Sequence, residues 1–426
     1  MTDTSTGPLE GIRVLDLSTE PGLYCGKLLA DMGADCIKVE PPGGDLARGL
    51  GPFFHDEVGR ETSLTYWYFN TNKRFVTCNI DEHDGQHLFR ELVKGADVVL
   101  ESFSPGHMDS RGIGYEQLKA IKPDLVYISI SPFGLDGPHR DWKTADIVTL
   151  AMAGVLTLAG DPADPPNRMF GNQAYISSSI AAAEGAALAL FHRERTGEGQ
   201  LVEVSMQEAL SMAQETAMMT WDFQKTSRQR NGELIRLPGL GTYQSADGYI
   251  YSMVGIAGFG APWSVLLDWM DDEGKAENLK SDPEYLEFLQ SMNMRTLTAL
   301  MTDPEAMAAK APLLNRIQEV LTAFYRSKPS MELYESGQGR RLLIGIISSP
   351  KDLLENPQLQ AREWYQTTEF RGDTVTYPGP PFRFMETPIT LRRTVAPVGA
   401  HNLEVWADEA GIPTADLELF LSEGAL

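Results

Sequence analysis

Short runs of β-branched residues alternate with segments of helical period through the first third of the chain, and this alternation constrains the fold more than any other feature. The expected strands are residues 12–18, 35–40, 75–80, 97–102 and 125–131, with helical segments such as 22–33 and 83–96 between them. Strands separated by helices pair in parallel, because each helix carries the chain back across a face of the sheet. The sequence therefore predicts an α/β fold with a doubly wound sheet.

A second composition begins near residue 242 and predicts a smaller α+β domain, with a hairpin followed by several amphipathic helices. The expected domains are 1–224 as the first part of a large domain, 225–241 as a linker, 242–340 as the small domain and 341–426 as a C-terminal segment.

One apolar helix is expected at residues 175–195, and its Ala, Ser and Gly residues permit close approach of a neighbouring backbone. Its most apolar part, 180–191, is shorter than a bilayer requires and contains Glu184. We therefore expect a core helix and no membrane span. A further long helix is expected from Met206 to about Gln224.

Acidic residues outnumber basic ones, with 59 Asp and Glu against 36 Lys and Arg, and the formal net charge is −23 at pH 7. Such a surface repels phosphate backbones on average, so nucleic acid is not an expected partner. Three cysteines in 426 residues form neither a disulfide framework nor a CxxC pair, so no metal site is expected. The first residues lack the features of a signal peptide, and we expect a cytoplasmic protein.

Motifs of common catalytic sites are missing from the sequence. There is no HExxH, P-loop or GxSxG phrase. The seven histidines, His107 among them, have no fixed spacing to acidic partners and are expected in the core or in solvent.

Several phrases, in order along nearly the whole chain, carry a resemblance to a known family. They include PLEGIRVLDLS, LLADMGADCIKVEPPGGDLAR, FNTNKRFVTCNI, ESFSPGHMDSRGIGYEQLKAIKPDLVYISISPFGLDGP and HRERTGEGQLVEVSMQEAL. In these phrases the chain resembles the class III CoA-transferases, also called CaiB/BaiF. That family contains formyl-CoA and carnitine CoA-transferases and, by divergence, α-methylacyl-CoA racemase.

The resemblance implies a Rossmann-like large domain built from both chain ends, to which residues 341–426 return, and a small α+β domain between them. It also implies that two subunits interlock like chain links and bury a large, obligate interface. The implied substrates are a coenzyme A thioester, such as succinyl-CoA, and a small carboxylic acid. No permanently bound cofactor is implied.

Coenzyme A carries several phosphate groups, so the cations in the matching phrases become candidate ligands. The candidate CoA-binding residues are Lys38, Arg48, Asn72, Lys73, Arg74, Phe103 and Arg111. Phe103 resembles an apolar wall for the adenine. The alternative is that Lys73 and Arg74 are ordinary surface charges and that Phe103 belongs to the core. The family pattern has Asn where Ser102 stands and Arg one place before Arg111, so the phosphate contacts are expected to be altered.

The catalytic position departs most from the family. Its transferases use one aspartate at the start of a helix as a nucleophile, which takes the acyl group from CoA as a mixed anhydride. The family spacing places Tyr175 at this position, and a shifted alignment places Asn172 there. A phenol with a pKa of about 10 is mostly neutral at pH 7, and an amide is no nucleophile. No catalytic residue is therefore assigned.

Two further family positions have also changed. The histidine of the racemase branch aligns with Ala145, next to Asp146, and the first loop lacks the glutamine that transferases place near the acyl group. Because these changes accompany the lost aspartate, the chain resembles the non-catalytic subunit of heteromeric members such as benzylsuccinate CoA-transferase. Its partner would be a paralogue that carries the aspartate.

Two alternatives remain open. The first is a self-sufficient homodimeric acyl-CoA transferase, isomerase or lyase with a non-standard site, in which Glu20, Asp146, Asn172 and Tyr175 would position the substrate. The second is a protein that binds acyl-CoA without turnover.

Overall fold

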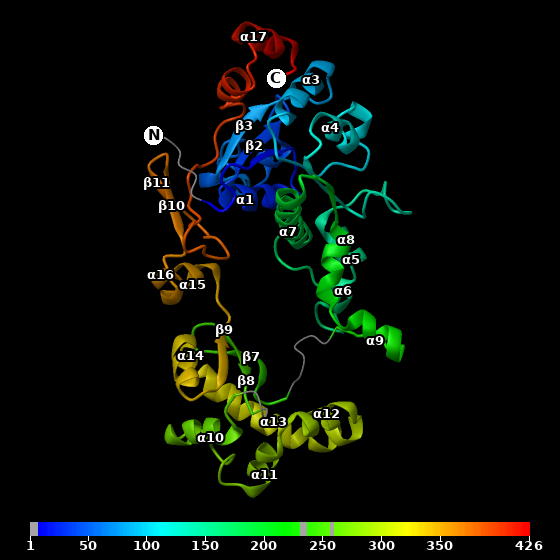
Figure 1. Cartoon of the computed structure of the whole chain (residues 1–426). Helices are drawn as coiled ribbons and strands as arrows, with labels where there is room; N and C mark the ends of the chain where they lie inside the picture. Colours follow the sequence, from blue (N-terminus) through cyan, green and yellow to red (C-terminus); the bar gives the residue numbers. More distant parts are fainter. Residues whose placement is uncertain (1–6, 231–236, 256–259) are drawn as a thin grey trace. The chain divides into compact units, whose positions relative to one another are not determined.

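The computed structural model describes residues 7–230, 237–255 and 260–426, which divide into two compact units (Figure 1). The large unit takes the chain up to Ala159, then Pro166–Arg228 and Glu363–Leu426. The small unit takes Gly160–Pro165 and the described part of Gln229–Arg362. Both ends of the chain therefore contribute to the large unit, as the resemblance implies.

The chain returns to the large unit at Glu363, and the expected boundary at residue 341 is wrong. The reason is that β9 (Leu343–Ile346) pairs antiparallel with β8 (Tyr249–Met253) and completes the sheet of the small unit. The expected linker, 225–241, lies partly outside the described residues. Its last two residues already belong to β7 (Leu240–Gln244).

Six parallel strands form the sheet of the large unit, in the order β3-β2-β1-β4-β5-β6. They are β1 (Arg13–Asp16), β2 (Asp35–Glu40), β3 (Lys73–Thr77), β4 (Val98–Glu101), β5 (Val126–Ser131) and β6 (Leu201–Ser205). The chain builds outward from β1 to β3 and then returns to place β4 on the other side of β1. This is the doubly wound order, and it confirms the predicted α/β fold.

Helices cover both faces of the sheet. They are α1 (Leu23–Asp31) and α7 (Gln173–Thr196) on one face, and α3 (His83–Val93), α4 (Tyr115–Ile121), a π-helix (Leu403–Glu409) and α17 (Thr414–Glu423) on the other. Val14 and Val98 pack toward the first group, and Leu15 and Val99 toward the second, because side chains alternate along a strand.

Shorter elements fill the connections of the large unit. They are α2 (Leu64–Phe69), α5 (Asp146–Met152), α6 (Val155–Leu158), α8 (Met206–Ser211), α9 (Ala217–Gln224), the hairpin of β10 (Gln366–Phe370) and β11 (Asp373–Tyr377), and single turns at Leu46–Gly49, Phe54–Asp56, Asp109–Arg111 and Met212–Gln214. The long helix expected from Met206 to Gln224 is wrong, because Glu215 has a left-handed φ of 46° and separates α8 from α9.

Helix α7 lies against α1, β5 and β6. Ala182 and Ala186 are fully buried there, and a Cβ at Gly185 would lie 2.7 Å from Val202 Cγ1. Among the described residues, α7 is the one helix whose length and composition would suffice to cross a membrane, and 44% of its most apolar window is buried. Its small residues allow the close packing that the sequence predicts for this segment.

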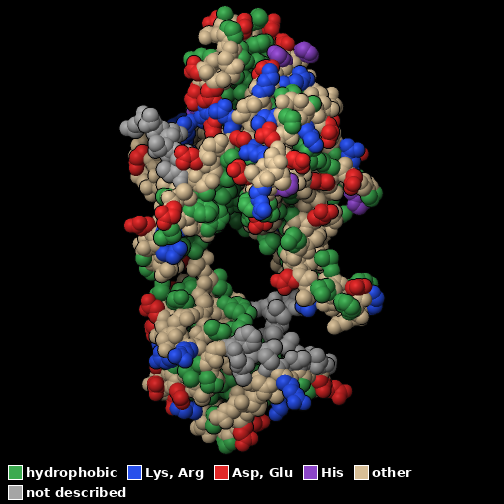
Figure 2. All heavy atoms as spheres, viewed as in Figure 1, with side chains coloured by type: hydrophobic (Ala, Val, Ile, Leu, Met, Phe, Trp, Pro, Cys, Tyr) green, Lys and Arg blue, Asp and Glu red, His purple; other side chains and the backbone are tan. Residues whose placement is uncertain are grey.

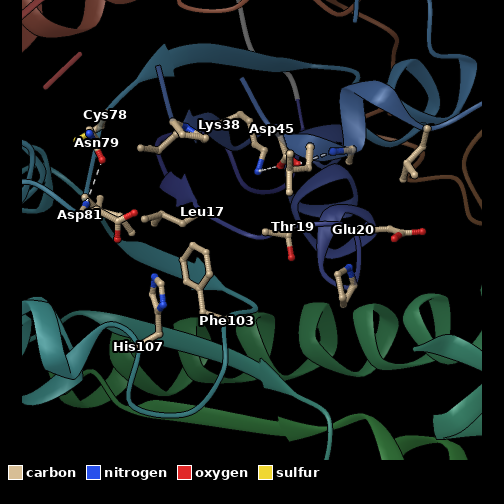
Figure 3. A pocket seen from close by; sticks show the side chains of 17 residues that line it. Leu17, Thr19, Glu20, Lys38, Asp45, Cys78, Asn79, Asp81, Phe103 and His107 are labelled. Carbon is tan, nitrogen blue, oxygen red and sulfur yellow. Dashed lines mark hydrogen bonds and ion pairs between the residues drawn. The ribbon is translucent and has the colours of Figure 1, made fainter. Parts of the chain in front are cut away.

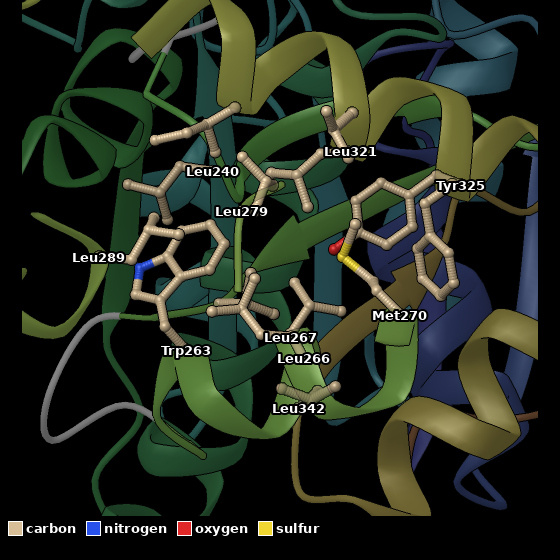
Figure 4. Close-up of a cluster of buried hydrophobic side chains, with 14 of the residues drawn as sticks. Leu240, Trp263, Leu266, Leu267, Met270, Leu279, Leu289, Leu321, Tyr325 and Leu342 are labelled. Carbon is tan, nitrogen blue, oxygen red and sulfur yellow. The ribbon is translucent and has the colours of Figure 1, made fainter. Parts of the chain in front are cut away.

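The small unit combines a three-stranded antiparallel sheet, in the order β7-β8-β9, with helices on a single core (Figure 4). The helices of this core are α10 (Trp263–Asp272), α11 (Pro283–Ser291), α12 (Met294–Thr302), α13 (Pro304–Arg326) and α14 (Ser330–Gly339). The short helices α15 (Pro350–Leu354) and α16 (Pro357–Ala361) belong to the same unit and bury no residue. Trp263, Leu266 and Tyr325 are buried in this core. The predicted hairpin corresponds to β7 and β8.

The returning C-terminal segment is fastened to the start of β3 by Asn72. Its Oδ1 accepts hydrogen bonds from the backbone nitrogens of Arg392 (2.6 Å) and Arg393 (3.0 Å), and its Nδ2 donates to Asp31 Oδ1 (2.7 Å). Further along, Trp406 is fully buried in the core of the large unit. The sheet is therefore completed by residues from the far end of the chain.

Candidate functional site

A cavity of about 460 Å³ lies at the carboxyl ends of β1 to β4 in the large unit (Figure 3). It is lined by Leu17, Thr19, Glu20, Pro21, Lys38, Val39, Pro41, Asp45, Leu46, Ala47, Leu50, Cys78, Asn79, Ile80, Asp81, Phe103 and His107. The strand order reverses between β1 and β4, and ligands of open α/β sheets bind in the crevice at such a point. The fold therefore places a candidate ligand site here.

Phe103 lines this cavity, where it stacks on His107 with ring centroids 4.3 Å apart and 21° between the planes. Burial lowers the pKa of His107, and the Arg111 guanidinium lowers it further, which favours the neutral imidazole. The backbone nitrogen of Phe103 donates to Glu101 Oε2 at 2.6 Å, which fixes the start of the loop. The stacked pair forms a flat wall suited to a heterocyclic base.

Glu101 is buried beneath this wall at the end of β4. Burial raises its pKa from 4.5 to about 7. The carboxyl group is thus partly protonated near neutral pH while it holds the backbone of Phe103.

Lys38 also lines the cavity, but its charge is neutralised within the protein. Its Nζ lies 2.9 Å from Asp45 Oδ2 and also donates to the Ser18 carbonyl, and the residue is 1% exposed. Asp45, Asp16 and Glu40 together raise the pKa of Lys38 against the opposing effect of burial. The ammonium group therefore stays charged and is already paired.

Arg48, expected to bind a CoA phosphate, is instead fully buried beside the sheet. Its Nε and Nη2 donate to the two carboxylate oxygens of Glu40 at 2.8 and 2.9 Å, and its guanidinium lies 4.5 Å from the ring centre of Tyr66. This bidentate pair holds the loop after β2 and leaves the guanidinium without access to the cavity.

Lys73 and Arg74 lie at the amino end of β3, away from the cavity. Lys73 Nζ is fully buried and donates to Asp16 Oδ2 at 2.7 Å and to Asn70 Oδ1 at 2.8 Å. Arg74 pairs with Asp35 and Glu409 and is 5% exposed. Neither the phosphate role nor the alternative of ordinary surface charges describes these buried ion pairs.

A glycine makes room for the pair of Lys73 and Asp16. A Cβ at Gly26 of α1 would lie 2.2 Å from Asp16 Oδ2 and 2.8 Å from Lys73 Nζ. The helix can therefore cross the buried charges closely only with glycine at this position.

The last two candidates occupy different places. Asn72 fastens the C-terminal segment, as described above, and lies outside the cavity lining. Arg111 is at the rim, where its Nε donates to Asp81 Oδ1 at 2.7 Å and its Nη1 to the carbonyl of His107 at 2.8 Å. Arg111 is thus beside the aromatic wall, in contact with two residues that line the cavity.

The start of α7 gathers the residues of the expected catalytic position. Asn172 Nδ2 donates to Glu20 Oε1 at 2.5 Å, and its Oδ1 accepts from Arg168 Nη2 at 2.9 Å. Tyr175 borders the same small space of about 20 Å³ beside Glu20 and Asn172. Both candidate positions, Tyr175 and Asn172, therefore lie close to one end of the large cavity, with Glu20 bordering both spaces.

Tyr175 is not an anion at neutral pH. Burial, together with Glu20 and Asp146, raises the pKa of its phenol to about 12. The carboxylate of Asp146 is hydrogen-bonded to the helix backbone, because its Oδ1 accepts from the backbone nitrogen of Ala174 at 2.8 Å. This bond satisfies one of the free N–H groups at the start of α7.

Sequence reasoning missed the pairing of Glu20 with Asn172 and the place of His107 in the cavity. Only three residues separate Phe103 from His107, which was a local signal that their rings could meet. No local signal joins Glu20 to Asn172, which are 152 positions apart. Within the described ranges, no group of three or more His, Cys, Asp or Glu residues is placed to hold a metal ion.

Comparisons with known proteins agree over nearly the whole chain. The family model described as CoA-transferase family III matches residues 9–402. The chain is 37% identical over 419 residues to the succinyl-CoA:(R)-benzylsuccinate CoA-transferase subunit BbsE of Thauera aromatica, covering 97% of each protein. It is 30% identical to the formyl-CoA:oxalate CoA-transferase of Streptomyces avermitilis, covering 99% of this chain and 100% of the relative. A CAIB/BAIF family protein from Brucella suis has a similar structure, with a TM-score of 0.78, 27% identity, and 94% of this chain and 99% of that chain covered.

Proposed function

The chain belongs to CoA-transferase family III, and from this premise we propose that it is one subunit of a transferase that moves CoA between an acyl-CoA, such as succinyl-CoA, and a carboxylic acid. In this proposal a paralogous partner carries the nucleophilic aspartate. The relative named as a subunit of a benzylsuccinate CoA-transferase supports the heteromeric assembly.

The observation that carries the proposal is the composition of the α7 start. The two positions that the family spacing offers for the aspartate hold Tyr175, whose phenol stays neutral, and Asn172, whose amide is not nucleophilic. Asp146, the nearby carboxylate of α5, is 4% exposed and committed to the helix backbone. None of these three residues provides an accessible carboxylate at the start of α7.

The cavity at the carboxyl ends of the strands is the proposed CoA site. Phe103 and His107 would flank the adenine, and Arg111 at the rim would turn from Asp81 toward a phosphate group. Apolar residues such as Leu17 and Val39 would line the pantetheine arm. CoA is a substrate in this proposal and not a resident cofactor.

Exposed apolar side chains support an extensive partner interface on the large unit. Leu188 and Phe191 of α7 are 69% and 61% exposed, and Phe223 of α9 is 79% exposed. Apolar residues in such numbers are typical of obligate interfaces. We propose the interlocked dimer of the family, with the catalytic paralogue or a second copy of this chain as the other subunit.

The interspersed charges of the surface give no support to a nucleic-acid partner. Figure 2 shows acidic and basic side chains mixed over the visible face of the large unit. A phosphate backbone would require basic residues gathered in a patch.

The test is to express the chain alone and together with an aspartate-bearing paralogue, and to measure exchange of labelled succinate into succinyl-CoA. We expect exchange only in the co-expressed complex, and loss of that exchange when the partner's aspartate is changed to asparagine. Exchange by this chain alone, at a rate equal to that of the complex, would contradict the proposal.

A second candidate function is a self-sufficient homodimer, and one observation favours it. Glu20 is a carboxylate of this chain that lines the cavity near the start of α7. If Glu20 were a nucleophile, incubation with an acyl-CoA would produce an acylated protein that hydroxylamine cleaves. Mass spectrometry of the peptide containing Glu20 distinguishes the two candidates.

A further inference from the structure

Glu20 stands at one end of the large cavity. In Figure 3, Thr19 and Glu20 lie at this end, whereas Cys78, Asn79 and Asp81 lie at the other. Glu20 also borders the small space beside Asn172 and Tyr175. Its half-buried carboxylate is therefore the charged group at the boundary between the cavity and the start of α7.

The neighbours of Glu20 hold it as a hydrogen-bond acceptor. The Asn172 amide has its orientation fixed by the Arg168 guanidinium, which donates to Oδ1 and leaves Nδ2 to donate to Glu20. An amide N–H held in this orientation donates a charge-assisted hydrogen bond to the carboxylate of Glu20 and stabilises its ionised form. Glu20 Oε1 is thus engaged as the acceptor of this hydrogen bond.

Two acidic and two basic residues lie around Glu20, and each basic residue lies next to one of the acidic residues. Burial raises the pKa of Glu20, and Asp146 and Asp45 raise it further, whereas the hydrogen bond from Asn172 lowers it. The cations nearby have other partners, since Lys38 pairs with Asp45 at 2.9 Å and Arg168 lies 3.6 Å from Asp146. Among these described residues, the carboxylate of Glu20 is therefore the charge that has no cation as its partner.

Resting on the proposed function, we propose that Glu20 makes this pocket select against CoA thioesters whose acyl group carries its own carboxylate. With the adenine against Phe103 and His107, the thioester would point to the opposite end of the cavity, where Glu20 lies. A second carboxylate within about 4–6 Å would be repelled, and partial exclusion of water strengthens the repulsion. Free CoA and thioesters of neutral short acyl groups meet no such barrier.

This selection would make the two pockets of a heteromer unlike. The partner's pocket would hold the dicarboxylic thioester for chemistry, and the pocket of this chain would be left to free CoA or to a neutral thioester. Glu20 acts here as a specificity-determining residue and forms no bond with the acyl group.

The test is calorimetric titration of the full chain, expressed alone, with CoA, acetyl-CoA and succinyl-CoA. The variants are Glu20→Gln, which keeps the size of the side chain, and the control Glu355→Gln, which removes one charge from the exposed residue that follows α15. We expect the wild type to bind acetyl-CoA about tenfold more tightly than succinyl-CoA. Glu20→Gln should remove this difference, and Glu355→Gln should retain it.

Each outcome bears on a different statement. Equal binding of acetyl-CoA and succinyl-CoA by the wild type, or an unchanged ratio in Glu20→Gln, overturns the inference and leaves the proposed function standing. Failure of the wild type to bind any of the three ligands overturns the assignment of the cavity as a CoA site, and the inference with it. An acyl adduct on Glu20 overturns the inference in favour of a nucleophilic role.

Discussion

The hydrogen bond between Asn172 and Glu20 makes the substitution Asn172→Asp especially informative. It replaces the donor Nδ2, now 2.5 Å from Glu20 Oε1, by an oxygen atom, so that two carboxyl groups face each other. A lost hydrogen bond to a charged group costs about 1.5–3 kcal/mol, and solvent reduces this cost because Glu20 is only half-buried. Arg168, which donates to Asn172 Oδ1, offsets part of this free-energy cost by pairing with the new aspartate.

The two carboxyl groups cannot both ionise at this separation, so the pair is expected to retain one proton at neutral pH. The pKa of Glu20 is already raised by burial, and the substitution raises it further. The folded protein then binds this proton more tightly than the unfolded chain does. The stabilisation that comes from this bound proton is present at low pH and is lost as the pH rises through the pKa of the carboxyl pair in the folded protein. We expect a loss of about 1–2 kcal/mol at pH 8 and less than about 1 kcal/mol at pH 5.

The assay is thermal unfolding at pH 5 and pH 8 of the wild type, Glu20→Gln, Asn172→Asp and the double variant. At pH 8, Asn172→Asp should lower the Tm of the large unit by about 2–6 °C. The double variant should recover most of this loss, because the glutamine amide donates to the new aspartate and the pair is restored with its members exchanged. Equal Tm values for the wild type and Asn172→Asp at pH 8, or a double variant as unstable as Asn172→Asp, would refute the reasoning.

Three further predictions concern the same unit. Glu101→Gln should stabilise the large unit by about 3 kcal/mol at pH 8 and change its stability little at pH 5, because burial raises the pKa of Glu101 from 4.5 to about 7 and the ionised carboxylate destabilises the folded state at high pH. Urea unfolding at both pH values measures this, and a gain of the same size at pH 5 would contradict it. Phe103→Ala should weaken CoA binding about tenfold to a hundredfold by removing one aromatic face of the cavity, with Phe382→Ala, at a 44% exposed residue, as the control in calorimetry. Lys73→Met should destabilise the large unit by about 3–5 kcal/mol, because it leaves the buried carboxylate of Asp16 without its cation. A variant that keeps the wild-type Tm but binds CoA more weakly would instead favour the phosphate role expected from the resemblance.

The sequence predicts the strands and helices of the large unit because the spacing of apolar residues that distinguishes them involves only neighbouring positions. Val14 and Leu15 belong to opposite faces of the sheet, as the alternation of a strand requires. The break between α8 and α9 could not be predicted in this way, because glutamate at position 215 is not a residue type that indicates a positive φ. Local signals give the elements and miss an interruption of this kind.

The candidate site was predicted less completely than the fold. Phe103 lies in the cavity because it follows β4 directly, and the end of a strand can be placed from sequence. Lys73 and Arg74 were expected to bind phosphate because of the phrase in which they occur. Their partners Asp16 and Glu409 lie 57 and 335 positions away. Only the folded arrangement shows that those charges are already neutralised.

The fastening of the last residues to Asn72 and to the start of the sheet has a consequence for synthesis in the cell. The six strands have all been translated by Ser205, yet Arg392, Arg393 and Trp406 have not. At about 5–20 residues per second, the ribosome needs about 10–40 s to pass from Arg228 to Leu426. During that interval α3 and α4 cover only part of the face that they share with the last two helices. We expect chaperones to bind the uncovered part until those helices arrive.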